Sequence, residues 1–163
     1  MRARHVAIGL LAITVLPIAI AQHHQAAEQP IDGSKHPELI SDTTAYRLFL
    51  ATYAGADNQH RKLQSALFQK IGISQDDQVI MTNTLNDFNV RFPQILGEDA
   101  KETALNPSTD HRTFVINRDL MMDDILRALG VQLSRVGFQR LNGYVQGEKQ
   151  RMRISPELER RRQ

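Results

Sequence analysis

Apolar residues in this chain recur at steps of three and four, and capping residues bound the runs in which they do so. The segment 74–93 shows the pattern: Ser74 stands at its start, and Met81, Leu85 and Phe88 follow at helical spacing. No stretch alternates with period two for long enough to indicate a sheet. The chain is therefore expected to be all-α, an irregular bundle of four to five short helices that follows a cleaved signal peptide.

Capping and breaking residues set the expected helix boundaries. Ser41 or Asp42 begins the first helix and Gly55 ends it, and the expected helices cover 41–55, 57–72, 74–93, 114–133 and a last helix from 134. Residues 98–105 could form one further short helix. Pro93 is expected to end or kink the third helix, and Gly130 weakens the case for an unbroken helix over 114–133. The predicted core face of the second helix is Leu63, Ala66, Leu67 and Ile71, and that of the last helix is Phe138, Leu141, Val145 and Met152.

The N-terminus has the three parts of a secretory signal peptide. Arg2 and Arg4 precede an uncharged apolar run over 6–20, and Ala19-Ile20-Ala21 fits a signal-peptidase site. The alternative is a transmembrane anchor, but fifteen residues reach only about 22 Å as a helix, less than a hydrocarbon core of about 30 Å. We expect a signal peptide (1–21), a flexible leader (22–36), a helical domain (37–154) and a basic tail (155–163), in a periplasmic or secreted protein.

Charge is unevenly distributed along the chain. The complete sequence has 20 Lys+Arg and 18 Asp+Glu, and removal of the signal peptide leaves 18 of each. Residues 22–124 carry 9 Lys+Arg and 15 Asp+Glu, whereas residues 125–163 carry 9 and 3. The basic segment could bind anionic lipid, a polyanion or an acidic partner. We favour the simpler interpretation, in which it packs beside the acidic segment and neutralises it.

The chain contains no cysteine, which excludes a disulfide framework, thiolate zinc sites and a Cys nucleophile. The sequence also has no H-E-x-x-H, EF-hand loop, G-x-S-x-G elbow or phosphate-binding glycine loop. His36, His60 and His111 are widely spaced, and the pairs Asp76-Asp77 and Asp123-Asp124 point about 100° apart on a helix. No catalytic residue and no cofactor is implied, and Asp76-Asp77 has a capping explanation.

Two stretches carry a resemblance. One runs from Ile40 to Leu50 and contains Asp42 and Ala45-Tyr46-Arg47-Leu48-Phe49; the other runs from Leu133-Ser134 through Gly137, Leu141, Val145 and Glu148-Lys149 to Met152 and Ile154. Together they resemble a class of uncharacterised exported bacterial helical proteins, whose members share an A-Y-R-L-F helix and a late L-S-x-x-G…E-K-x-x-M segment. The resemblance implies a helical fold and export, and no activity.

A weaker resemblance is to periplasmic stress proteins with an L-T-x-x-Q motif, which are small helical chaperones or sensors. Leu133-Ser134 match the first two positions, whereas Gly137 stands where that family has Gln, and no second copy of the motif is present.

One metal site is a candidate. Cleavage after Ala21 would leave a mature chain beginning Gln22-His23-His24. A free amine, two deprotonated amides and the imidazole at position three form a square-planar nitrogen site of the kind that suits Cu(II) or Ni(II). Cyclisation of the terminal Gln would remove that amine, and the simpler interpretation is a polar leader.

Basic residues concentrate near the C-terminus. They offer weak contact with an anionic membrane, at up to about 1 kcal/mol each; the residues are Lys149, Arg151, Arg153, Arg160, Arg161 and Arg162. A solvated terminus is the simpler interpretation. Nucleic acid is not an expected partner, because no aromatic residue in the basic run can stack on bases.

Taken together, these features favour a non-catalytic module of the cell envelope that acts as an interaction, sensor or chaperone-like protein on a protein partner not identified by the sequence. The alternatives are an envelope enzyme whose Asp, Glu and His side chains converge only in three dimensions, and a metal-handling protein that uses the mature N-terminus.

Overall fold

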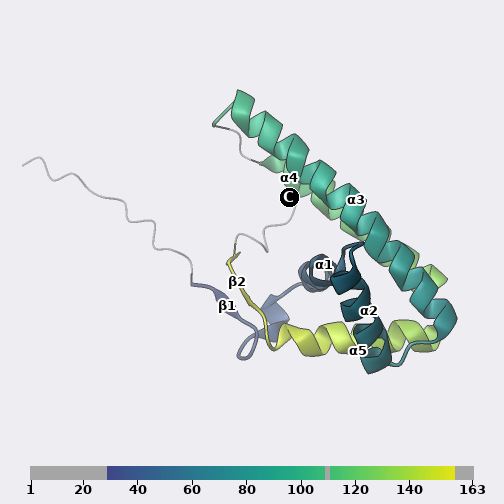
Figure 1. Cartoon of the computed structure of the whole chain (residues 1–163). Helices are drawn as coiled ribbons and strands as arrows, with labels where there is room; N and C mark the ends of the chain where they lie inside the picture. The colour runs from purple at the N-terminus through teal and green to yellow at the C-terminus, as the bar shows by residue number, and fades with distance from the viewer. Residues whose placement is uncertain (1–28, 109–110, 157–163) are drawn as a thin grey trace, which may run out of the picture.

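The computed structural model describes residues 29–108 and 111–156 (Figure 1). Five α-helices make up most of this part of the chain, so the expected all-α class is confirmed. In chain order the elements are β1 (Ile31–Asp32), a 3₁₀ helix η1 (Pro37–Leu39), α1 (Asp42–Tyr53), α2 (Asn58–Ile71), α3 (Gln75–Leu105), α4 (Arg112–Gln132), α5 (Arg135–Lys149) and β2 (Arg153–Ile154).

Helices α3 and α4 form a long antiparallel hairpin, and α1 lies between that hairpin and α5 (Figure 1). Helix α2 packs on α1 and α5, and the distal part of the hairpin extends beyond the other helices. Because α1 contacts all four other helices, its apolar side chains occupy the centre of the core. The most completely buried large side chains are Ile40, Leu50, Met81, Leu85, Met121, Met122, Leu129, Leu141 and Val145.

Most of the predicted caps begin or end the helices, but α1 ends at Tyr53 with Ala54 as its C-cap, before the expected stop at Gly55. The Ser41 hydroxyl accepts a hydrogen bond from the backbone N–H of Thr44, and Ser134 caps α5 in the same way. The Asp57 carboxylate accepts from two backbone N–H groups at the start of α2. Gly72 ends α2 with a φ of 72°, a left-handed conformation that glycine adopts at little cost.

The third helix is longer than predicted. The helix does not end at Pro93, and residues 98–105 are helical but belong to α3 and not to a separate helix, because α3 continues to Leu105. Pro93 removes one backbone donor, but the packing of α3 on α4 spans this position. The stacked rings of Phe88 and Phe92, with centroids 5.0 Å apart, continue the buried stripe up to Pro93, and Ile95 packs against the core beyond it. Helix α4 likewise passes through Gly130 unbroken.

A two-stranded antiparallel sheet joins the two ends of the described chain. Ile31 pairs with Ile154 and Asp32 with Arg153, which corrects the expectation of a flexible leader up to residue 36. Gly33 follows β1, and a Cβ atom on it would stand 1.8 Å from the Lys149 carbonyl oxygen, so glycine is required there. Strands of two residues are too short to show a period in the sequence.

The buried face of α2 also differs from the prediction. Leu67 and Ile71 are buried as expected, but Leu63 is 43% exposed, Ala66 is also exposed, and Gln64 and Phe68 face the core instead. The Gln64 side-chain amide donates to the carbonyl oxygens of Tyr53 (2.9 Å) and Gly55 (3.1 Å). These two hydrogen bonds fasten α2 to the end of α1 and satisfy the buried polar side chain of Gln64.

None of the helices within 29–108 and 111–156 combines the length and apolar character needed to cross a membrane. The expected signal peptide over 1–21 lies outside the described residues.

Candidate functional site: the hollow between α1 and α5

The two stretches that carry the resemblance pack against each other as α1 and α5. The Lys149 ammonium donates to Asp42 Oδ1 at 2.5 Å, and the Gln146 amide donates to the same oxygen at 2.8 Å. The Tyr46 hydroxyl donates to Asn142 Oδ1 at 3.3 Å. These contacts fix the register of the two helices and therefore place the side chains that lie further along them.

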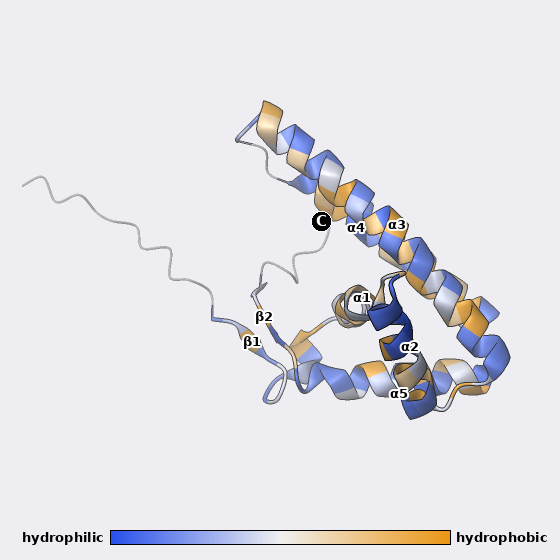
Figure 2. Cartoon of the chain, in the orientation of Figure 1, coloured by the Kyte–Doolittle hydropathy of each residue, from blue (hydrophilic) through white to orange (hydrophobic). Residues whose placement is uncertain are grey.

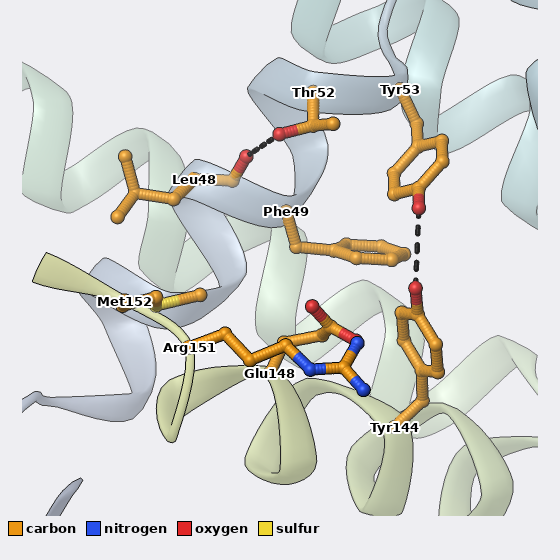
Figure 3. Close-up of a pocket in the computed structure, with 8 residues that line it drawn as sticks. All are labelled: Leu48, Phe49, Thr52, Tyr53, Tyr144, Glu148, Arg151 and Met152. Carbon is orange, nitrogen blue, oxygen red and sulfur yellow. Dashed lines mark hydrogen bonds and ion pairs between the residues drawn. The ribbon is translucent and has the colours of Figure 1, made fainter. Parts of the chain in front are cut away.

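Beyond these contacts the two helices leave an open hollow of about 220 Å³ (Figure 3). Its lining comes from α1, from the C-terminal half of α5 and from the two residues before β2: Leu48, Phe49, Thr52, Tyr53, Tyr144, Glu148, Arg151 and Met152. The apolar side chains Leu48, Phe49 and Met152 are buried or half-buried, so the apolar part of this lining lies within the recess.

Three aromatic rings form one wall of the hollow. The Phe49 ring centroid lies 5.2 Å from that of Tyr53 and 6.0 Å from that of Tyr144, the latter in an edge-on arrangement. The Tyr53 and Tyr144 hydroxyls are 3.2 Å apart and share a hydrogen bond across the gap between the helices (Figure 3). The rings are therefore held rigidly, and the two hydroxyls form one polar point on an apolar wall.

The Tyr53 hydroxyl is a neutral group at physiological pH. Burial, followed by the hydrogen bond with Tyr144, raises the pKa of Tyr53 to about 12. Both causes favour the protonated form. Tyr53 is therefore a hydrogen-bonding group in this hollow and is not a base.

Charged groups stand at the rim. Glu148 accepts a hydrogen bond from Arg151 at 2.9 Å, and the Lys70 ammonium of α2 lies 4.9 Å from the centroid of the Tyr144 ring. A second, shallower hollow of about 570 Å³ adjoins the first and shares Tyr144, Glu148 and Arg151 with it. Together the two hollows can take an apolar side chain beside a polar or charged group.

Several residues singled out from the sequence lie elsewhere. Gln22, His23 and His24 fall outside the described residues, as do Arg160, Arg161 and Arg162. No group of three His, Asp or Glu side chains suited to a metal forms within the described ranges.

The prediction that Lys149 contacts a membrane is wrong. Only 7% of the residue is exposed, because its chain lies between α1 and α5 to reach Asp42. It is therefore not part of a membrane-facing surface. Arg151 and Arg153 do lie on the surface, where they pair with Glu148 and Asp32.

The histidines and acid pairs stay separate. His36, His60 and His111 each pair with a different nearby carboxylate. Asp124 bonds Arg91 and Arg127 on the surface of the hairpin. Asp77 is buried at the start of α3, where its backbone N–H donates to the hydroxyl of the N-cap Ser74 and its carboxylate accepts from that hydroxyl.

The expected neutralisation of the basic segment is only partly right. Lys149 and Arg153 pair with acids from the front of the chain, Asp42 and Asp32. Helix α5, however, packs mainly on α1 and α2, and α2 carries three basic residues and no acid. The basic segment therefore lies beside another basic helix.

Sequence reasoning missed the hollow because its walls come from residues about 90 positions apart. One signal was available: the chain contains three tyrosines, and all of them, Tyr46, Tyr53 and Tyr144, lie at the α1–α5 interface.

Comparison of the chain with known protein families, curated proteins and solved structures finds no match. The site must therefore be interpreted from its own chemistry.

Proposed function

We propose that this protein is a non-catalytic interaction module of the cell envelope that binds a protein partner through the hollow between α1 and α5. The observation that carries the proposal is a recess lined by Phe, two Tyr, Met and Arg side chains at the surface of a rigid helix pair. These residue types are enriched at the energetic centres of protein–protein interfaces. The rings are fixed by their mutual contacts, so binding would cost little side-chain entropy.

The size of the hollow supports a protein partner. Pockets for free small molecules have volumes of about 300–1,000 Å³. The aromatic hollow is about 220 Å³ and open to solvent, which suits one bulky side chain. The adjoining hollow, of about 570 Å³, is large enough for a small molecule but more open still, which suits a segment of a larger surface. A chaperone-like or sensor role would use the same recess for a segment of a client or signalling protein.

The envelope location rests on the N-terminal pattern of Arg2, Arg4, the apolar run and Ala19-Ile20-Ala21. Its test is the intact mass of protein recovered from a periplasmic or culture fraction. A mass that begins at Gln22 supports export, and a full-length mass in the cytoplasm contradicts it.

Site-specific photocrosslinking tests the hollow itself. A photoreactive amino acid replaces Thr52, which is exposed at the rim, and a matched variant carries it at Val90, which is 58% exposed on the hairpin. We expect a discrete crosslinked partner from Thr52 in envelope extract, lost when Tyr144→Ala is added, and none from Val90. The same products from both positions, or none from Thr52, would contradict the proposal.

A further inference from the structure

The fold separates charge between two pairs of helices. Helices α2 and α5 together carry six Lys or Arg residues and one acid, Glu148; five of the six basic residues are exposed, and the sixth, Lys149, is buried against Asp42. Helices α3 and α4 carry nine Asp or Glu residues and five basic residues. Figure 2 shows hydrophilic residues along much of α2, and α2 packs on both α1 and α5. The α2–α5 surface is therefore positive, whereas the hairpin is negative.

This positive surface is continuous with the aromatic hollow. Lys70 and Arg151 both line the second hollow, together with Tyr144. The one carboxylate there, Glu148, is already paired with Arg151, so the local charge remains positive through Lys70. An anionic group that enters beside Tyr144 would be attracted by the positive charge of Lys70, and no buried ion pair would have to break.

The backbone of α5 is accessible along the same stretch. Gly143 and Gly147 lie one turn apart and line the second hollow, and a Cβ atom added at either position would meet nothing within 4 Å. Internal packing therefore does not require glycine at either position. An extended chain could lie close to α5 here while one of its side chains enters the aromatic hollow.

We propose that the partner presents an acidic segment with one bulky apolar side chain, which enters the hollow while its carboxylates face Lys70 and Arg151. This inference rests on the proposed function and names the chemistry of the partner. A peptide fits better than an anionic membrane because Phe49 is only 4% exposed and lies within the recess. Membrane anchors must protrude from the surface to insert into lipid.

Fluorescence anisotropy with labelled ten-residue peptides tests the inference on the complete secreted protein. One peptide is rich in Glu and Asp with a central Phe, a second has Ser in place of Phe, and a third keeps Phe but has Gln in place of the acids. We expect the first to bind most tightly and to weaken as salt rises from 20 to 300 mM, because exposed charges are screened over about 10 Å at 0.1 M.

Charge-reversal variants locate the effect. Lys70→Glu and Arg151→Glu should each weaken binding of the acidic Phe peptide by about fivefold or more. Lys101→Glu, an equal charge change on the exposed hairpin, should leave it within about twofold. Circular dichroism checks that each variant is folded. The neutral variant Lys70→Gln should weaken binding less than Lys70→Glu if charge is the cause.

Three results would overturn the inference. In the first, the Gln peptide binds as tightly as the acidic Phe peptide and its affinity does not depend on salt. In the second, the acidic Phe peptide does not bind at 1 mM. In the third, the protein binds vesicles containing 30 mol% anionic phospholipid in preference to the peptides. If one of these results is obtained but the photocrosslink from Thr52 is still observed, the proposed function stands and only the acidic character of the partner is disproved. Loss of the crosslink would remove the proposed function.

Discussion

Asp77 at the start of α3 receives two hydrogen bonds from Ser134 at the start of α5. The Ser134 backbone N–H donates to Asp77 Oδ1 at 2.8 Å and its hydroxyl donates to Oδ2 at 2.7 Å. The Ser74 hydroxyl adds a third bond at 2.8 Å. One buried carboxylate therefore joins the N-termini of two helices, where the helix dipoles favour negative charge. This junction accounts for Ser134 and Gly137 of the L-S-x-x-G segment.

Asp77→Asn should destabilise the protein by about 1–3 kcal/mol, because the amide keeps the shape of the carboxylate but loses its charge at two helix ends. Urea unfolding followed by circular dichroism measures the change. Asp76→Asn is the matched control: Asp76 is exposed in the same helical turn, and its replacement should stay within about 0.5 kcal/mol. Equal effects of the two substitutions would contradict the junction.

The same carboxylate predicts a dependence of stability on acid pH. Burial alone would raise the pKa of Asp77, but the hydrogen bonds from Ser134 and Ser74 outweigh it and lower the pKa below 3.8. A lowered pKa in the folded state stabilises the protein above the unfolded pKa, and this stabilisation is lost as the pH falls through the folded pKa. The free energy of unfolding should therefore fall below about pH 4, with a shallower slope in Asp77→Asn. Parallel pH profiles of the two proteins would contradict this assignment.

Gly137→Ala should destabilise the protein although alanine favours helices. A Cβ atom at Gly137 would lie 2.3 Å from Asp77 Oδ2, so the carboxylate must move away from Ser134. We expect a loss of about 2 kcal/mol or more, from the weakened buried hydrogen bonds. Gly143→Ala, on the same helix with open space around the new Cβ, should instead stabilise by about 0.5–1 kcal/mol. Thermal unfolding of both variants measures the contrast, and a stabilising Gly137→Ala would disprove the contact.

Alkaline pH should weaken the contact between α1 and α5 through Tyr53. Burial and the Tyr144 hydrogen bond raise the pKa of Tyr53 from 10 to about 12. A raised pKa stabilises the folded protein below pH 10, and this contribution is lost as the pH rises towards 12. Absorbance titration at 295 nm should show late ionisation that decreases in Tyr53→Phe. Burial also raises the pKa of Tyr46 to about 12. Tyr46→Phe is therefore the control variant, in which the ionisation of Tyr53 should remain late.

The mature N-terminus gives a metal-binding prediction that does not involve the folded domain. If cleavage exposes the Gln22 amine, Cu(II) should bind with a visible absorption band of tetragonal nitrogen coordination. His24→Ala should abolish this band, whereas His23→Ala should retain it, because only the third residue supplies its imidazole. Intact mass establishes whether the amine is free. An N-terminus that is blocked or cut elsewhere would end the hypothesis.

Local signals predicted much of the helical architecture. The caps Ser41, Asp57, Ser74 and Ser134 and the stop at Gly72 lie where side-chain chemistry and backbone conformation require them. These signals act within one helical turn, so the sequence displays them directly. The predicted break at Pro93 failed because a neighbouring helix, α4, stabilises α3 across the position of the proline.

The candidate site could not be predicted in the same way. Tyr53 and Tyr144 are 91 residues apart, and only the packing of α1 on α5 brings their hydroxyls to 3.2 Å. Lys149 shows the same limit: a basic residue in a basic run resembles a solvated side chain, yet the fold buries it against α1 with its ammonium on Asp42.

The sequence by itself determined the all-α class, the helix starts and the uneven distribution of charge along the chain, because periodicity, caps and composition are local properties. Tertiary structure decided which helices became neighbours. It placed basic α5 beside basic α2, used Asp77 to join α3 to α5, and brought three aromatic rings together as one wall of an open hollow. The physical reason is that burial and long-range hydrogen bonds select among helix arrangements that local pattern leaves equal in free energy.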